Sequence, residues 1–349
     1  MKFNHYEIVN LKSNVNNEKI DYPKKDFIFN LFSFKKSFYI IIFLVFFILI
    51  LLIKMREEKD RENTNSKKYM NLEKFEINIY NKINNNNLFR CSRMWENQRA
   101  FLNGVVRKFK PKKILEIGVA EGGSSIVILN AIKDIKNSHL FSIDLSSNDM
   151  IGYCVKNIFH NLSNKWNLFT GNIPAKFMKK IGKNIDMVFI DSGHYEPGEI
   201  LDFLIVLPFL KEEAIVMFHD IGNQITKSDG KNSRRNWAPY KIFNIIRGKK
   251  FYPSGKGILI KDIGAIKLEK NQFNYIYDYF RTLGGQWDYF PEESHIDLIR
   301  KFIKIYYDND CLVMFEETVK FNRKFVKNNP VYVRPLYTSI SKKHFLNKK

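Results

Sequence analysis

Short apolar runs alternate with segments of helical spacing through the middle of this chain. Each run carries little charge and is followed by a glycine or by a polar side chain. Runs of this kind are typical of parallel strands that helices cover on both faces. The alternation therefore predicts a doubly wound, mostly parallel, Rossmann-like α/β sheet. The expected parallel strands are 114–117, 139–143, 166–170, 186–190 and 214–218.

Helical spacing also appears on both sides of these strands. Apolar side chains between Trp95 and Phe109 recur at helical intervals, which predicts a helix ahead of the first strand. Residues 258–260 and 265–268 are expected to form an antiparallel pair that closes the sheet, and 272–326 to be helical. The long polar stretch 222–235 shows no periodicity, so it is a candidate lid or substrate loop.

The longest apolar run, 38–53, lies outside this pattern. It is apolar on every face, which favours a single transmembrane helix over a buried core helix. Although the run is shorter than the ~20 residues that a bilayer usually requires, Lys35, Lys36 and Lys54 can extend to the interface. A cleaved signal peptide fits poorly because no small-residue cleavage site follows. Lysine and arginine flank both ends, so the orientation stays open.

The anchor divides the chain into segments of different character. The sequence predicts a polar tail (1–37), the anchor (38–53), a charged and asparagine-rich linker (54–87), a globular domain (88–270), and a helical extension with a basic tail (271–349). The formal net charge is +21, with basic residues scattered along the chain. Such scatter favours a location near an anionic membrane surface over a specific nucleic-acid groove.

The cysteines give little information by their spacing. Cys91, Cys154 and Cys311 are far apart and odd in number, so neither a metal site nor a disulfide framework is expected. A reducing compartment is the simpler interpretation, and none of the three has the surroundings of a nucleophile.

The turn after the first expected strand contains the most informative motif. It reads Glu116-x-Gly118-x-x-x-Gly122-Gly123, with a helix starting near Ser124. Glycines let a backbone approach a ligand closely, and the helix that follows presents free N–H groups to it. The dinucleotide fingerprint would need a glycine where Ala120 stands, so a nicotinamide site is disfavoured.

Polar side chains follow the other expected strands at their carboxyl ends. Since open α/β sheets bind ligands at this edge, we expect these side chains to share one site. An acid after the second strand can accept hydrogen bonds from ribose hydroxyls, although it can equally cap a helix. The residues are Asp144 after the second strand, Asn172 after the third, Asp191 and His194 after the fourth, and His219 and Asp220 after the fifth.

Together these blocks resemble a class I S-adenosylmethionine (SAM)-dependent methyltransferase, in the branch that includes small-molecule and sugar O-methyltransferases. The blocks are 114–125, 142–144, 188–196 and 218–220, and the resemblance spans roughly residues 90–265. It implies a seven-stranded sheet, SAM as cofactor, and a saccharide or other small hydroxylated acceptor. With SAM as cofactor, the domain is expected to face the cytosol, where SAM is made, while the apolar run 38–53 contacts the bilayer.

The resemblance also implies roles for individual residues. His194 would be the general base, with Asp191 beside it as a second catalytic residue. A divalent cation such as Mg²⁺ would be held by Asp191, His219 and Asp220, although His219 stands where an acid is more usual. The residues that would bind SAM are Glu116, Gly118, Gly122, Gly123, Ser124, Asp144, Asn172 and Asp191.

Three other functions are compatible with parts of this pattern. A catalytically silent SAM-binding scaffold would explain His219 in the place of an acid. A nicotinamide-dependent oxidoreductase would use a related sheet, but it conflicts with Ala120. A nucleic-acid methyltransferase would suit the positive charge, but no Asn-Pro-Pro-Tyr-like block for a flipped base is present.

Overall fold

The computed structural model describes Ile48, Cys91 and residues 94–222, 237–253 and 262–328. All of these except Ile48 belong to one compact unit that spans Asn65–Lys349. No helix among the described residues is long and apolar enough to cross a membrane. Apart from Ile48, the predicted anchor at 38–53 lies outside the described residues, as does the candidate lid at 223–235.

The compact unit is built on a seven-stranded sheet, which confirms the predicted α/β class. Its strand order is β3-β2-β1-β4-β5-β7-β6, and only β7 runs antiparallel to its neighbours β5 and β6. The chain leaves β1 first toward β2 and β3, and later toward β4 and β5, so the carboxyl ends of β1 and β4 meet at a switch point. The strands are β1 (Lys113–Ile117), β2 (His139–Asp144), β3 (Trp166–Thr170), β4 (Ile185–Ile190), β5 (Leu210–His219), β6 (Gly248–Phe251) and β7 (Ile263–Leu268).

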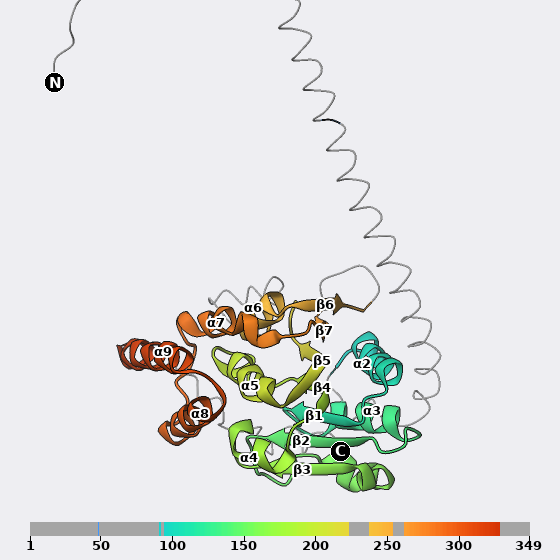
Figure 1. Cartoon of the computed structure of the whole chain (residues 1–349). Helices are drawn as coiled ribbons and strands as arrows, with labels where there is room; N and C mark the ends of the chain where they lie inside the picture. Colours follow the sequence, from blue (N-terminus) through green and yellow to red (C-terminus); the bar gives the residue numbers. More distant parts are fainter. Residues whose placement is uncertain (1–47, 49–90, 92–93, 223–236, 254–261, 329–349) are drawn as a thin grey trace, which may run out of the picture. The chain divides into compact units, whose positions relative to one another are not determined.

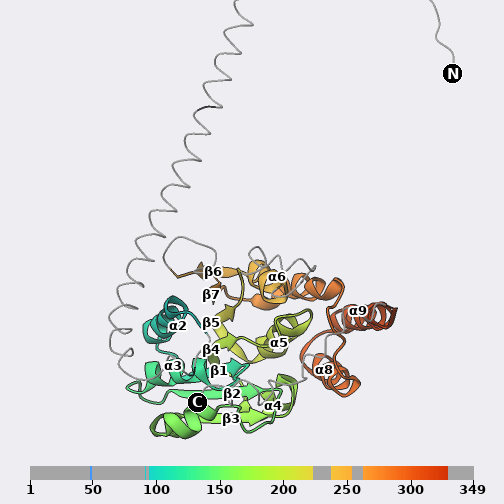
Figure 2. The same cartoon turned by 180° about the vertical axis from the view of Figure 1, so that it is seen from behind.

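Helices cover both faces of the sheet (Figures 1 and 2). Neighbouring strand residues such as Ile114 and Leu115 are both buried but belong to different cores, because successive side chains point to opposite faces. One core holds α2 (Glu96–Phe109) and α3 (Gly123–Ile132). The other holds α4 (Pro174–Ile181), α5 (Gly198–Val206), α6 (Trp237–Ile245), α7 (Ile276–Arg281), α8 (Glu293–Tyr306) and α9 (Asn309–Asn328).

Single helical turns complete the described chain. The π-helical turn η2 (Cys154–Ile158) and the 3₁₀ turns η3 (His160–Lys165), η4 (Leu207–Phe209), η5 (Gln272–Tyr275) and η6 (Thr282–Gly284) connect the main elements. The predicted helical extension after residue 271 is present as α7 to α9.

The edge of the sheet differs from the prediction. The strand predicted at 265–268 is present as β7, but its described partner is β6 at Gly248–Phe251. Residues 258–260, which were expected to be that partner, lie outside the described part of the chain. The sequence of β6 is Gly-Lys-Lys-Phe, with one large apolar residue, so the apolar pattern gave no sign of an edge strand.

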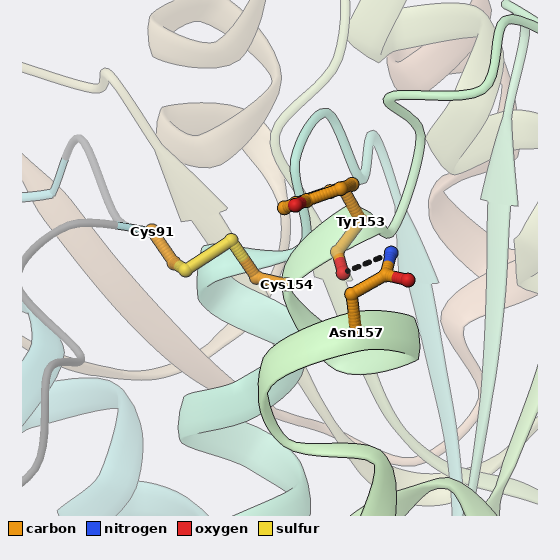
Figure 3. The surroundings of a disulfide bond; sticks show 4 residues. All are labelled: Cys91, Tyr153, Cys154 and Asn157. Carbon is orange, nitrogen blue, oxygen red and sulfur yellow. Dashed lines mark hydrogen bonds between the residues drawn. A yellow bond between two sulfur atoms is a disulfide. The ribbon is translucent and has the colours of Figure 1, made fainter. Parts of the chain in front are cut away.

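The expectation that no disulfide forms is wrong. Cys91 and Cys154 are bonded, with their Cα atoms 6.0 Å apart (Figure 3). They are separated by 63 residues, and only the packing of η2 beside α3 brings Cys154 to Cys91, so their spacing carried no signal. The Cys154 backbone N–H also donates to the Glu121 carbonyl, which joins this disulfide to the glycine turn.

Candidate active site

The glycine turn after β1 is shaped by two glycines with positive φ. Gly118 has φ 88°, and a side chain there would place its Cβ 1.9 Å from the backbone oxygen of Asp191. Gly122 has φ 93° and precedes the first turn of α3. Only glycine tolerates this combination of backbone conformation and close approach, so the turn brings β1 and β4 together at the switch point.

The side chain of Glu116 stabilises the glycine turn from inside the protein. Its fully buried carboxylate accepts hydrogen bonds from the hydroxyls of Ser124, Ser125 and Ser142, each at 2.6 Å. The Trp166 indole N–H donates in turn to Ser142. The structure therefore places Glu116 and Ser124 in a network that connects the first three strands to α3, rather than on the wall of the cavity.

The buried carboxylate of Glu116 predicts a pH-dependent stability. Burial raises its pKa from 4.5 to about 7, although the three serine hydroxyls oppose the shift. Between these values the folded protein binds more protons than the unfolded chain, so this contribution to stability is lost as the pH rises. The unfolding free energy of the wild type is therefore expected to fall between pH 4.5 and pH 7. In Glu116→Gln this fall should be smaller by on the order of 3 kcal/mol. Urea unfolding at both pH values measures this.

Glu317→Gln, which changes an exposed carboxylate on α9, is the matched control and should leave the pH dependence unchanged. Equal pH dependence in Glu116→Gln and the wild type would show that the carboxylate is not held in its neutral form.

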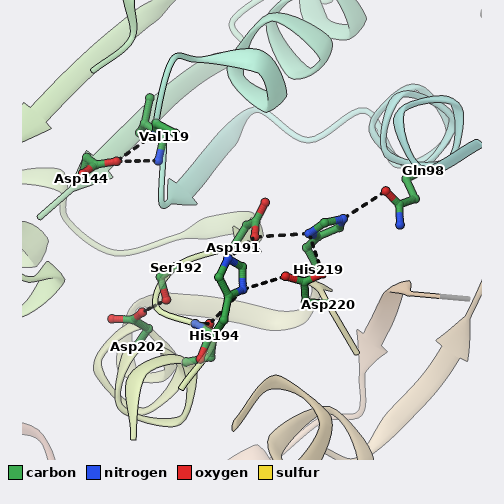
Figure 4. Close-up of polar contacts among 11 residues, drawn as sticks. Gln98, Val119, Asp144, Asp191, Ser192, His194, Asp202, His219 and Asp220 are labelled. Carbon is green, nitrogen blue, oxygen red and sulfur yellow. Dashed lines mark hydrogen bonds and ion pairs between the residues drawn. The ribbon is translucent and has the colours of Figure 1, made fainter. Parts of the chain in front are cut away.

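A cavity of about 830 Å³ opens at the carboxyl ends of the strands. Of the residues predicted to bind the cofactor, Gly118, Asp144 and Asn172 line it. Asp144 is fixed to the glycine turn because its Oδ2 accepts from the backbone N–H groups of Val119 and Ala120, at 2.9 and 3.0 Å (Figure 4). A carboxylate has further lone pairs, so Asp144 can still accept hydrogen bonds from a ligand in the cavity.

His194 lines this cavity and is held by two acids. Its Nδ1 lies 2.8 Å from Asp220 Oδ2, and its backbone N–H donates to Glu199 Oε1 at 2.5 Å. With the Nδ1 proton directed at Asp220, the lone pair is on Nε2. Burial alone would lower the pKa of His194, but the hydrogen bond to Asp220 and the nearby charges raise it.

His194 and Asp220 also share an unusual backbone conformation. Their φ angles are 60° and 57°, in the left-handed region that residues other than glycine seldom occupy. Holding two contacting residues there costs about 1–2 kcal/mol each, a cost that is concentrated at functional sites.

His219 lies on the opposite side of Asp191 and Asp220 from His194 (Figure 4). Its Nε2 lies 3.1 Å from Gln98 Oε1, and because that oxygen can only accept, Nε2 carries a proton. Its Nδ1 is buried, makes no hydrogen bond to any described residue, and lies 3.3 Å from Asp191 Oδ1. Burial opposes a charge on His219, but the carboxylates of Asp191 and Asp220 raise its pKa to about 9.

This arrangement fits a divalent cation. One ligand atom each from Asp191, His219 and Asp220 lie within 4.8 Å of one another. In the neutral imidazole, a cation would accept the lone pair of His219 Nδ1, and it would balance the two carboxylates that otherwise lie beside this nitrogen. Gln98 fixes the imidazole in the tautomer that such a ligand requires.

Three residues around the site had no signal in the sequence. Gln98 comes from α2, ahead of every motif, and Glu199 lies inside α5. Asp262 precedes β7, and burial together with the charge of Asp220 raises its pKa to about 7. Each reaches the site only through the fold, and none stands at a spacing that a motif would reveal.

Residues 115–221 match the family model described as a methyltransferase domain. This segment contains the glycine turn, the acids after β2 and β4, and the His219–Asp220 pair. With the strand order described above, the match identifies a class I SAM-dependent methyltransferase domain in this chain. No curated protein matches the chain significantly.

Several solved structures are similar to the domain. An O-methyltransferase from Bacillus cereus with bound SAH is 17% identical over 56% of this chain and 90% of its own, with a TM-score of 0.41. A putative caffeoyl-CoA O-methyltransferase from Staphylococcus aureus is 20% identical over 55% and 90%, with a TM-score of 0.41. The O-methyltransferase TomG from Streptomyces achromogenes, in complex with SAM, is 17% identical over 50% and 81%, with a TM-score of 0.40. Likeness of this degree does not identify the acceptor.

Proposed function

We propose that this protein transfers the methyl group of SAM to a hydroxyl oxygen of a saccharide or another small hydroxylated acceptor. The observation that carries the proposal is that His194 lines the cavity and lies beside Asp191 and Asp220, inside the segment that matches the methyltransferase family. Carboxylates and an imidazole at one edge of a sheet suit the activation of an alcohol.

The reaction follows from the placement of these groups. The acceptor oxygen forms a bond to the methyl carbon while the bond from that carbon to sulfur breaks, and sulfur keeps the electron pair. His194 Nε2 takes the hydroxyl proton, and Asp220 stabilises the imidazolium through Nδ1. Holding the two reactants in line supplies much of the rate, since proximity alone is worth roughly 7–11 kcal/mol.

A divalent cation held by Asp191, His219 and Asp220 would make the acceptor hydroxyl more acidic. His219 and Gln98 keep the ligand atoms in place, and His194 remains free of the set because its Nδ1 is bonded to Asp220.

Loss of Asp144 tests the cofactor site. Asp144→Ala is expected to weaken binding of SAM by about 10–100-fold, because it removes both the acceptor for ribose hydroxyls and the bracing of the glycine turn. Calorimetric titration of the full chain measures this. Asp134→Ala, at an exposed acid after α3, is the control and should bind as the wild type does. A wild-type protein that binds neither SAM nor SAH would refute the proposed function.

We also propose that residues 38–53 anchor the protein as a single-pass membrane helix with its catalytic domain in the cytosol. Resistance to carbonate extraction, lost on deletion of 38–53, tests the anchor. The cytosol keeps thiols reduced, so this orientation predicts that Cys91 and Cys154 react with an alkylating agent in intact cells, although the fold lets them bond. Finding the pair oxidised in cells would place the domain on the opposite side.

A catalytically silent SAM-binding scaffold is the second candidate, and His219 in the place of an acid favours it. It predicts SAM binding without transfer to any of a panel of sugars and phenols. Methylation of any one of these acceptors would exclude it.

A further inference from the structure

The cavity extends beyond the segment that matches the methyltransferase family. Helix α8 packs against both α4 and α5, the two helices that flank the carboxyl ends of β3 and β4. In Figure 1 it lies beside them at the lower left of the domain. The loop before α8 and its first turns contribute to the cavity wall with Tyr289, Phe290, Pro291, Glu292, His295 and Ile299.

The rest of the wall near these residues has a mixed character. Ile173, Leu201 and Ile205 give it apolar surface. A polar pair lies among them, because the hydroxyl of Ser192 donates to Asp202 Oδ2 at 2.6 Å. Asp202 is buried. A flat, apolar ring with polar atoms on its edge suits such a compartment, and adenine is the part of SAM with this shape.

The part of the cavity wall that the C-terminal extension contributes is hydrogen-bonded to the loop that carries His194. The Glu196 backbone N–H donates to Asp288 Oδ2 at 2.9 Å, and the Asp288 N–H returns a bond to the Glu196 carbonyl at 2.9 Å. Asn322 of α9 supports the far side, since its side chain accepts from the Trp287 N–H at 2.7 Å and donates to the Gly285 carbonyl at 3.1 Å. The extension and the β4–α5 loop therefore form one connected structure.

The Tyr289 hydroxyl lies close to two glycines that follow β4. A side chain at Gly198 would place its Cβ 3.4 Å from the Tyr289 hydroxyl, and one at Gly193 would place it 3.8 Å away. Tyr289 therefore borders the cavity together with the connection between β4 and α5.

We propose that the segment 285–299 of the C-terminal extension forms the outer wall of the adenine compartment, and that Tyr289 and His295 contact the adenine ring. This inference rests on the proposed function, because it assigns part of the site where SAM binds. It means that the family-matched segment does not close its own cofactor site, and that a segment more than sixty residues further along the chain completes it.

Binding of SAH and of adenosine to the full chain tests the inference. Tyr289→Ala and His295→Ala are each expected to weaken both ligands by about tenfold and by the same factor, because the lost contact is to the part that the two ligands share. Tyr277→Ala and His160→Ala replace a tyrosine and a histidine outside the cavity wall, and both should bind as the wild type does.

The outcomes separate this inference from the proposed function. If the wild type binds neither ligand, both fail. If the wild type binds and the two cavity variants match it, only the adenine wall is overturned. The adenine wall is also overturned if the two cavity variants weaken binding of SAH but not of adenosine, since the lost contact would then be to the amino-acid part of SAH. His295 is only half-buried, so its variant gives a result even if Tyr289→Ala lowers the melting temperature.

Discussion

Replacing His194 by alanine is expected to lower kcat for methyl transfer by about 10²–10⁴-fold, the usual contribution of a general base. The effect should fall on kcat, because proton removal belongs to the transition state and not to cofactor binding. The affinity for SAH should change by less than about threefold, since His194 is one of many residues that line the cavity and Asp144 and Gly118 remain in place. Single-turnover rates with saturating SAM, together with SAH calorimetry, measure the two quantities.

Two further variants make this test specific. His160→Ala removes an exposed histidine on η3 and should leave kcat unchanged. Asp220→Asn should also lower kcat, since it removes the charge that orients the His194 ring through Nδ1. A His194→Ala enzyme that keeps its rate within a factor of three would remove His194 from the mechanism, and the reaction would then have to rely on alignment alone.

The sequence predicted the central sheet because its strands are covered on both faces and therefore read as apolar runs. The same logic predicted the candidate site, since Asp144, Asp191 and His219 stand at the carboxyl ends of such runs, and the structure has them at the ends of β2, β4 and β5. Prediction from apolar runs fails where a strand lacks such a run. The edge strand β6 has two lysines among its four residues and carries no apolar pattern, so only its pairing with β7 reveals it.

Contacts between distant segments could not be read from local patterns. Gln98 reaches His219 across 121 residues of sequence, and Asp288 reaches Glu196 across 92. The pairing of Cys91 with Cys154 depends in the same way on the fold. Glu116 shows a different limit. It lies in β1, just ahead of the glycine turn, but the direction of its side chain depends on three serines that only the packed structure brings together.

Removal of divalent cations is expected to lower kcat by at least about 100-fold, and the choice of the restoring ion should depend on His219. An imidazole nitrogen among two carboxylates favours Mn²⁺, Co²⁺ or Fe²⁺ over Mg²⁺, which prefers oxygen ligands throughout. We therefore expect Mn²⁺ to restore transfer at lower concentration than Mg²⁺. His219→Asp should reverse this order, because it supplies a third carboxylate oxygen at the same position.

Binding of Mn²⁺, followed by its paramagnetic resonance signal, gives a readout that does not depend on the acceptor. Asp191→Ala should abolish the bound signal, and Gln98→Leu should weaken binding by about 10–100-fold because His219 loses the partner that fixes its ring. Glu213→Gln, at an exposed acid on β5, is the control. If the wild type binds no Mn²⁺, then Nδ1 of His219 carries a proton, and its imidazolium balances Asp191 and Asp220 in place of a cation.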